Sequence, residues 1–280
     1  MALKDILVQL DPSAASERRL EVACQLARQH NAHLHGLCVV DLAGIGAQLY
    51  VDDFGAARVV EQLRVQAKAA AAGVEERFQE RMRTEGFTHE WTLDAGPAQD
   101  VVTDYARLVD LSILGQSDPA NPGVTAGTAI VEHVLFSSGR PVLMVPYAGT
   151  FGPIGNKVLI GWAPRREAAR AVNDALPLIA TNATVTVLTI IPRDDAVSHP
   201  GLSTAPIVEH MIRHGLKVQG REVVAGDVSA GDVLLNTAAD ESADLLVVGA
   251  YGHSRVRELV MGGVTRTLLE QATLPILMSH

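Results

Sequence analysis

Residues 243–266 read ADLLVVGAYGHSRVRELVMGGVTR, and this stretch decides how the rest of the sequence is interpreted. Leu245 to Val248 are four consecutive apolar residues, a run typical of a strand buried on both faces of a sheet. Gly249 and Gly252 end the run, and a polar, basic segment leads to the pair Gly262-Gly263. Apolar residues at helical spacing then follow. The stretch predicts a strand, a glycine loop and a helix.

This order of elements favours an anion as ligand. Glycines let the backbone approach a ligand closely, and a helix start presents unpaired N–H groups with a partial positive charge. The alternative is a tight turn followed by an ordinary surface loop. The stretch matches neither the Walker A pattern nor the dinucleotide pattern G-x-G-x-x-G.

The sequence contains an internal repeat of about 140 residues. The linker between the copies, Tyr147–Asn156, is rich in Gly and Pro. Similar segments occur in the same order in both halves: Lys4–Asp11 with Asn156–Ala163, Asp110–Gly115 with Asp244–Gly249, and Arg140–Pro146 with Leu274–Met278.

Each half alternates strand and helix patterns, which predicts an α/β fold. We expect two tandem domains, 1–148 and 149–280, each a doubly wound, Rossmann-like domain with five parallel strands. Ligands of such sheets bind beyond the carboxyl ends of the strands, where the strand order reverses. A long Ala-rich helix, about Ala56 to Glu85, either covers a sheet face or offers a docking surface for a partner.

The composition limits the classes of function. Of 280 residues, 48% are hydrophobic and only 4% aromatic, so the cores must be aliphatic. The net charge of −9 argues against nonspecific nucleic-acid binding. There is no signal-peptide pattern and no apolar run near ~18 residues, so we expect a cytoplasmic protein without a membrane span. Cys24 and Cys38 are interpreted as buried small residues.

No metal site or catalytic constellation is expected. His30, His33 and His35 lie close in sequence, and His33 and His35 share a strand face, but no Cys or acidic partner sits at ligand spacing. His210 and His214 share a helix face, but a Glu precedes the first His, so the H-E-x-x-H pattern is absent; no G-x-S-x-G motif occurs either.

The spacing Gly249-x2-Gly252-x9-Gly262, followed by Gly263, resembles the nucleotide-binding signature of the universal stress protein family, Gly-x2-Gly-x9-Gly-Ser/Thr. The duplication resembles the tandem members of that family, and the resemblance covers essentially the whole chain. It implies an adenine nucleotide alpha hydrolase-like fold and ATP, ADP or AMP as ligand, with or without Mg²⁺. It also implies a role in the stress response through binding and signalling, with at most slow ATP hydrolysis.

The resemblance assigns the phosphates to the glycine loop and the following helix start. His253 and Arg255 either add positive charge there or face solvent. Gly263 replaces the usual Ser/Thr, and Ala163 stands where the family has a base-reading aspartate; Trp162 either walls the base or packs in the core. The complete predicted site is Trp162, Ala163, Ile190, Val248, Gly249, Tyr251, Gly252, His253, Arg255, Gly262, Gly263, Val264 and Thr265.

The first half shows the opposite pattern. It keeps the aspartate, Asp11, but has no glycine at the second motif position, and Thr128-Ala129 stands where the second half has Gly262-Gly263. We therefore expect that the first half does not bind ATP. Asp11 would instead cap the helix that follows it.

Two readings of the function stay open at this point. One is an adenine-nucleotide-binding stress protein; the other is a stress scaffold that acts through a protein partner and binds no nucleotide. Pairing of Pro141–Val145 with Pro275–Met278 would allow a monomer with an internal pseudo-dimer, and a homodimer is the alternative.

Overall fold

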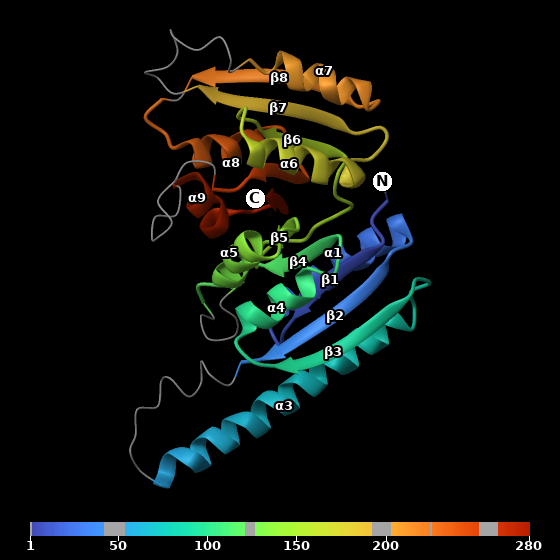
Figure 1. Ribbon diagram of the computed structural model, residues 1–280, viewed down its shortest axis with the longest axis vertical. Coiled ribbons are helices and arrows are strands. Elements are labelled where there is room, and N and C mark those ends of the chain that lie inside the picture. Colours follow the sequence, from blue (N-terminus) through green and yellow to red (C-terminus); the bar gives the residue numbers. More distant parts are fainter. Residues whose placement is uncertain (1, 42–53, 121–126, 192–202, 225, 252–262) are drawn as a thin grey trace. The chain divides into compact units, whose positions relative to one another are not determined.

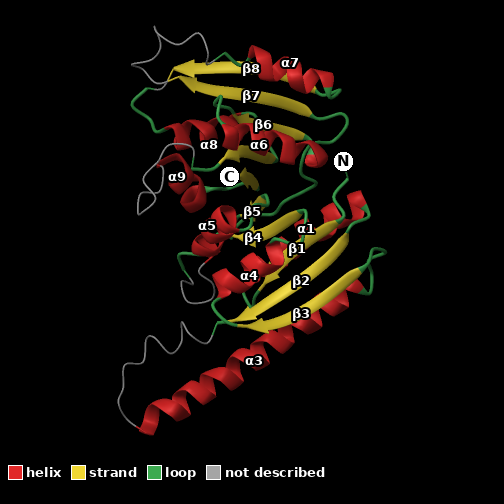
Figure 2. Cartoon of the chain, in the orientation of Figure 1, coloured by secondary structure: helices red, strands yellow, loops and turns green. Residues whose placement is uncertain are grey.

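The computed structural model describes residues 2–41, 54–120, 127–191, 203–224, 226–251 and 263–280. These residues form two compact units, Ala2–Arg140 and Pro141–His280. Strands and helices alternate along each unit (Figure 2), as the repeat predicts. None of the described helices combines the length and the apolar character that crossing a bilayer requires.

The first unit is built on a parallel sheet with the strand order β3-β2-β1-β4 (Figure 1). The chain adds β2 and β3 on one side of β1 and then returns to place β4 on the other side. The strand order therefore reverses between β1 and β4. The elements are β1 (Asp5–Leu10), α1 (Ala14–His30), β2 (His33–Val40), α3 (Phe54–Met82), β3 (His89–Ala95), α4 (Ala98–Ala106), β4 (Leu111–Gly115) and α5 (Gly127–Ser137).

The second unit has the order β5-β10-β9-β6-β7-β8, and the strand order reverses between β6 and β9. β5 is antiparallel to β10, with Leu143 opposite Leu277, so the predicted pairing of these two segments is confirmed. The elements are β5 (Val142–Val145), β6 (Lys157–Gly161), α6 (Arg166–Ala175), the 3-10 turn η1 (Leu176–Leu178), β7 (Thr184–Ile191), α7 (Ala205–Arg213), β8 (Lys217–Val224), α8 (Ala230–Asp240), β9 (Leu245–Gly249), α9 (Gly263–Gln271) and β10 (Ile276–Ser279).

The two units share one hydrogen-bond arrangement, in which an aspartate before one central strand binds the backbone at the start of the neighbouring strand: β1 in the first unit and β6 in the second. In the first unit, the Asp110 Oδ2 atom accepts a hydrogen bond from the Lys4 N–H at 2.7 Å. In the second unit, Asp244 Oδ2 accepts from the Lys157 N–H at 2.9 Å. Each aspartate directly precedes the strand on the far side of the reversal, so the repeat seen in sequence is also a repeat of contacts.

The cores are aliphatic, as the composition predicts. All five residues of β4 are buried, and so are Leu245 to Val248 of β9. α3 packs on β2 and β3 through its carboxyl-terminal turns, where Val74, Phe78 and Met82 are buried, so it covers a sheet face. A side chain at Gly36 would meet the Phe78 ring, which requires glycine there.

Both cysteines lie buried in the first unit. Burial raises the pKa of Cys24 to about 12, against the lowering effect of the Arg81 charge. Burial and the charge of Asp11 raise the pKa of Cys38 to about 11. Both thiols are therefore protonated in the folded state at neutral pH, in agreement with their interpretation as small core residues.

Candidate functional site

The predicted site lies at the carboxyl edge of the sheet in the second unit, around the reversal of strand order. β6 and β9 are neighbours there, and Gly161 at the end of β6 lies opposite Val248. The Trp162 N–H donates to the Leu188 carbonyl at 2.8 Å, which holds the chain after β6 against β7. The half-buried residues Trp162 and Ala163 and the end of β9 therefore meet at the position where this fold class binds ligands.

Gly249 has a structural reason to be glycine. A Cβ atom there would overlap the backbone of Glu167 and Ala168, in the first turn of α6. The end of β9 and the start of α6 thus approach each other more closely than any side chain allows. Ala250 then donates its N–H to the Ser279 carbonyl at 2.8 Å, so the ends of β9 and β10 stay aligned.

Tyr251 follows in the left-handed conformation, with φ of 64°. Its ring contacts that of His280 edge to face, with the centroids 6.3 Å apart. The positive φ marks the point where the chain turns away from the strand, because this conformation is uncommon for residues other than glycine.

α9 begins at Gly263, and among the described residues none lies within 4 Å of a Cβ atom added at this position. Val264 is exposed in part, whereas Thr265 is buried on the same helix face as Leu268 and Leu269. A helix start can receive an anion through its first N–H groups. The predicted site residues Gly252, His253, Arg255 and Gly262 lie outside the described residues.

Ile190 lies near the carboxyl end of β7, opposite Val223 of β8. It is half-buried and belongs to the same sheet edge as Trp162. Its assignment to the adenine end stays a prediction of the resemblance.

A carboxylate that sequence reasoning missed also lies at this edge. Glu167 is buried in the first turn of α6 and accepts a hydrogen bond from the Arg166 Nε–H at 2.5 Å. Burial alone would raise the pKa of Glu167. The Arg166 hydrogen bond, its own backbone N–H and the charges of Arg166 and His280 outweigh burial and hold that pKa below its usual value. Glu167 is therefore ionised at neutral pH, and it follows Ala163 by four positions.

The first unit has an ion pair at the corresponding edge. Asp11, directly after β1, accepts a hydrogen bond from Arg19 of α1 at 2.5 Å, and the two side chains are only 8% and 3% exposed. The Arg19 Nε–H also donates to the Gln9 carbonyl at 2.8 Å. A Cβ atom at Gly115 would meet this guanidinium, so Arg19 fills the space beside the end of β4.

The expectation that Asp11 caps the following helix is wrong, because the N-cap of α1 is Ser13 and no side chain caps the helix there. The Asp11 Oδ1 atom instead accepts from the Ser13 N–H at 2.8 Å, in the turn before the helix, and the sequence does not predict the ion pair. The signal was present: Arg19 precedes Ala23 by four positions, on the buried face of an amphipathic helix. A charged residue on such a face indicates a buried partner.

The helix start in the first unit is also occupied by the chain itself. The Ser117 Oγ atom accepts from the Thr128 N–H, at the start of α5, at 2.9 Å. A Cβ atom at Gly127 would come within 2.5 Å of the Gly115 carbonyl oxygen. The first turn of α5 thus packs directly on the chain that leaves β4, and one of its donors is satisfied by a side chain.

The histidine groups do not assemble a ligand set. His33 and His35 both approach Glu90, at 3.7 and 3.0 Å. The rings of His210 and His214 lie 4.8 Å apart on α7. Within the ranges that the structure describes, no three His, Cys, Asp or Glu residues are placed to hold a metal ion.

Comparison with known proteins supports the same reading of the chain. The model of the universal stress protein family matches residues 2–146 and again residues 156–280. A universal stress protein of Synechocystis, Slr1230, is 40% identical over 48 residues, which are 17% of this chain and 17% of that protein. The chain thus spans about a sixth of the curated relative that it matches.

Solved structures of low sequence identity share the fold. A universal stress protein from Archaeoglobus fulgidus superposes with a TM-score of 0.72 at 14% identity, over 98% of this chain and 95% of that one. A putative universal stress protein from Pseudomonas aeruginosa gives 0.59 at 18% identity, over 99% and 93%. The likeness extends over both halves of the chain.

Proposed function

Because this chain belongs to the universal stress protein family, we propose that its second half binds ATP or another adenine nucleotide and acts in the stress response by binding. The phosphates would lie between the end of β9 and the start of α9, and the base would lie towards Trp162 and Ile190. The observation that carries the proposal is the reversal of strand order between β6 and β9, at the sheet edge where β9 ends and after which the chain begins a helix at Gly263.

The charges at this edge suit a nucleotide in part. Arg165 and Arg166 are exposed at the start of α6 and add positive charge near the site. Glu167 offers a carboxylate in place of the one that Ala163 lacks, and we infer that it accepts a hydrogen bond from the base or ribose end. A Glu167→Gln substitution should then weaken ATP binding, whereas binding of inorganic triphosphate should stay unchanged.

A second candidate is a stress scaffold that binds no nucleotide. Ala163 and Gly263 favour it, because each removes a polar side chain that the family signature supplies. Both candidates predict no rapid turnover. Phosphate release well above background, abolished by a single side-chain substitution, would contradict both.

The first experiment is to denature the purified protein and to identify released ATP, ADP or AMP by mass spectrometry. Stripped protein is then titrated with ATP while the fluorescence of Trp162 is recorded in a Trp91→Phe background. We expect saturable binding that Gly252→Val or Gly262→Val abolishes. Gly86→Ala is the control, because a Cβ atom there meets nothing within 4 Å. No retained nucleotide and no response at millimolar ATP would leave the scaffold as the function.

A further inference from the structure

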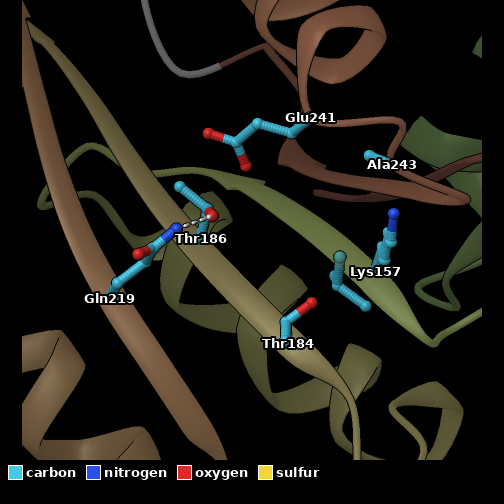
Figure 3. A pocket seen from close by; sticks show the side chains of 7 residues that line it. Lys157, Thr184, Thr186, Gln219, Glu241 and Ala243 are labelled. Atoms are coloured by element: carbon cyan, nitrogen blue, oxygen red, sulfur yellow. Dashed lines mark hydrogen bonds between the residues drawn. The ribbon is translucent and has the colours of Figure 1, made fainter.

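The second unit has a pocket at the amino edge of its sheet, the edge away from the proposed nucleotide site. Lys157 and Thr184 are the first residues of β6 and β7, and they form part of its wall. The volume is about 330 Å³, at the lower end of the range for pockets that hold small molecules. Figure 3 shows the polar side chains around it: Lys157, Thr184, Thr186, Gln219 and Glu241, with Ala243 at one end.

The pocket lies where one side chain of the second unit, Thr186, is smaller than its counterpart in the first unit. Thr186 lies opposite Gln219 on the neighbouring strand. In the first unit, His35 lies opposite Glu90 in the same pair of strands. The His35 ring packs edge to face on that of Tyr105 at 5.1 Å and fills the position. Threonine in place of the imidazole leaves open space in the second unit.

One polar contact in the wall is fixed. The Gln219 Nε2–H donates to the Thr186 Oγ1 atom at 2.9 Å, and Thr186 is only 5% exposed. Because the amide nitrogen of Gln219 is the donor in this contact, the orientation of the amide group is fixed, and its oxygen remains as an acceptor. Figure 3 shows the carbonyl end of Gln219 turned away from Thr186 and the Thr184 hydroxyl pointing from the neighbouring part of β7.

The wall also carries one charge of each sign, from separate elements. Lys157 comes from β6 and is exposed, and no carboxylate in the described part of the chain pairs with its ammonium group. Glu241 comes from the end of α8; its Oε1 atom lies 3.4 Å from the guanidinium of Arg221. A ligand with only a negative charge would be repelled by Glu241, and a ligand with only a positive charge would be repelled by Lys157. A neutral polyol would leave the Lys157 charge without a partner and would add none to Glu241.

We propose that this pocket binds a small zwitterion of the amino-acid class. The carboxylate of the ligand lies at Lys157 and its ammonium group at Glu241. The Thr184 hydroxyl contacts a polar group of its side chain, and Val158 provides an apolar wall. The site uses none of the residues of the proposed nucleotide site, so the two proposals stand or fall separately.

The test uses the full chain and isothermal titration calorimetry with each of the free L-amino acids at up to 20 mM. For the amino acid that binds best, the corresponding amine without the carboxylate and the corresponding acid without the amine are titrated next. Each charge-assisted contact is worth about tenfold in affinity, so each analogue should bind at least about tenfold more weakly.

Substitutions locate the site. Lys157→Met and Glu241→Gln should each lower the affinity by about tenfold, and Thr186→Val, which frees the Gln219 side chain, by a smaller factor. Lys217→Met is the matched control: Lys217 is also the exposed first residue of its strand, and its loss should leave the affinity unchanged. Circular dichroism and the urea midpoint confirm that each variant is folded.

Three results would overturn the proposal. They are the absence of binding by any amino acid at 20 mM, equal binding of the analogues that lack one charge, and unchanged affinity in Lys157→Met. Glucose is titrated in parallel. If glucose binds and no amino acid does, the pocket takes polyols and the zwitterion assignment is wrong.

Discussion

At the carboxyl edge of its sheet, each unit has a space beside the reversal of strand order, and the two units differ in the groups that lie there. In the first unit, the space beside the reversal of strand order is filled by the buried Asp11–Arg19 pair, and Ser117 caps the start of α5. In the second unit, the same edge has Ala163 in place of the aspartate, and among the described residues nothing lies within 4 Å of a Cβ atom added at Gly263. The two edges therefore share the reversal of strand order and differ in their side chains.

The comparison also explains why the retained aspartate is a poor indicator of function. Asp11 is the residue that resembles the base-reading carboxylate of the family, yet both of its oxygens bind groups of its own chain. A carboxylate with a buried cationic partner is already satisfied, and a ligand would have to displace the Arg19 guanidinium. The half that lacks the aspartate is therefore the better candidate for a nucleotide.

The largest expected effect comes from Arg19→Met. It leaves the Asp11 carboxylate buried without its cation, which should lower the free energy of unfolding of the first unit by about 3–5 kcal/mol. Urea unfolding followed by Trp91 fluorescence in a Trp162→Phe background measures it. The Asp11→Leu/Arg19→Met double variant should recover most of the loss. A loss below about 1 kcal/mol in the single variant would show that the pair does not hold this edge together.

The next effect compares two glycines of the second unit. Gly249→Ala should destabilise by about 1–3 kcal/mol, because its Cβ atom meets the backbone of α6, which cannot rotate away. Gly263→Ala places its Cβ atom more than 4 Å from every other part of the chain that the structure describes, and it should change the urea midpoint little. Trp162 fluorescence in the Trp91→Phe background reports both. Equal destabilisation by the two substitutions would contradict the assigned close approach.

A smaller effect is expected from Gly263→Ser, which restores the hydroxyl of the family signature. One added hydrogen bond to a phosphate is worth about 0.5–1.5 kcal/mol, so ATP affinity should rise by about two- to tenfold. Ala129→Ser at the aligned position of the first half is the control and should add no second binding event. A stoichiometry of two nucleotides per chain in either protein would contradict a closed first unit.

The smallest effect concerns pH. Burial lowers the pKa of His35, against the charge of Glu90, and His33 lowers it further. As pH falls below about 6.5, the unfolded state takes up the proton first, so the first unit should lose stability between about pH 7 and pH 5. His35→Gln should flatten this dependence, measured as urea midpoints against pH. The second unit, with Thr186 at this place, should not respond; an unchanged slope in His35→Gln would assign it to another group.

The sequence predicts the alternation of strands and helices and the repeat, because these depend on local apolar patterns. The pairing of the last strands follows only from the resemblance to the family. The close approach at Gly249 is also foreseeable, since a glycine at the end of a buried strand indicates a backbone contact. The Arg19–Asp11 pair and the Thr186–Gln219 pocket are not, because each depends on which side chains of separate elements meet. Glu167 was missed for the same reason: its burial depends on the packing of α6 against β9 and β10.

Because both cysteines lie in the core of the first unit, the rate at which a reagent labels their thiols reports how often that unit opens. A thiol reagent can modify Cys24 or Cys38 only when that unit opens, because each is buried and protonated in the closed state. The labelling rate of the native chain therefore counts openings of one half while the other half stays folded. If a nucleotide that binds the second half slows this labelling, the opening of the first half is coupled to the second half. If the rate is unchanged, the first half opens independently.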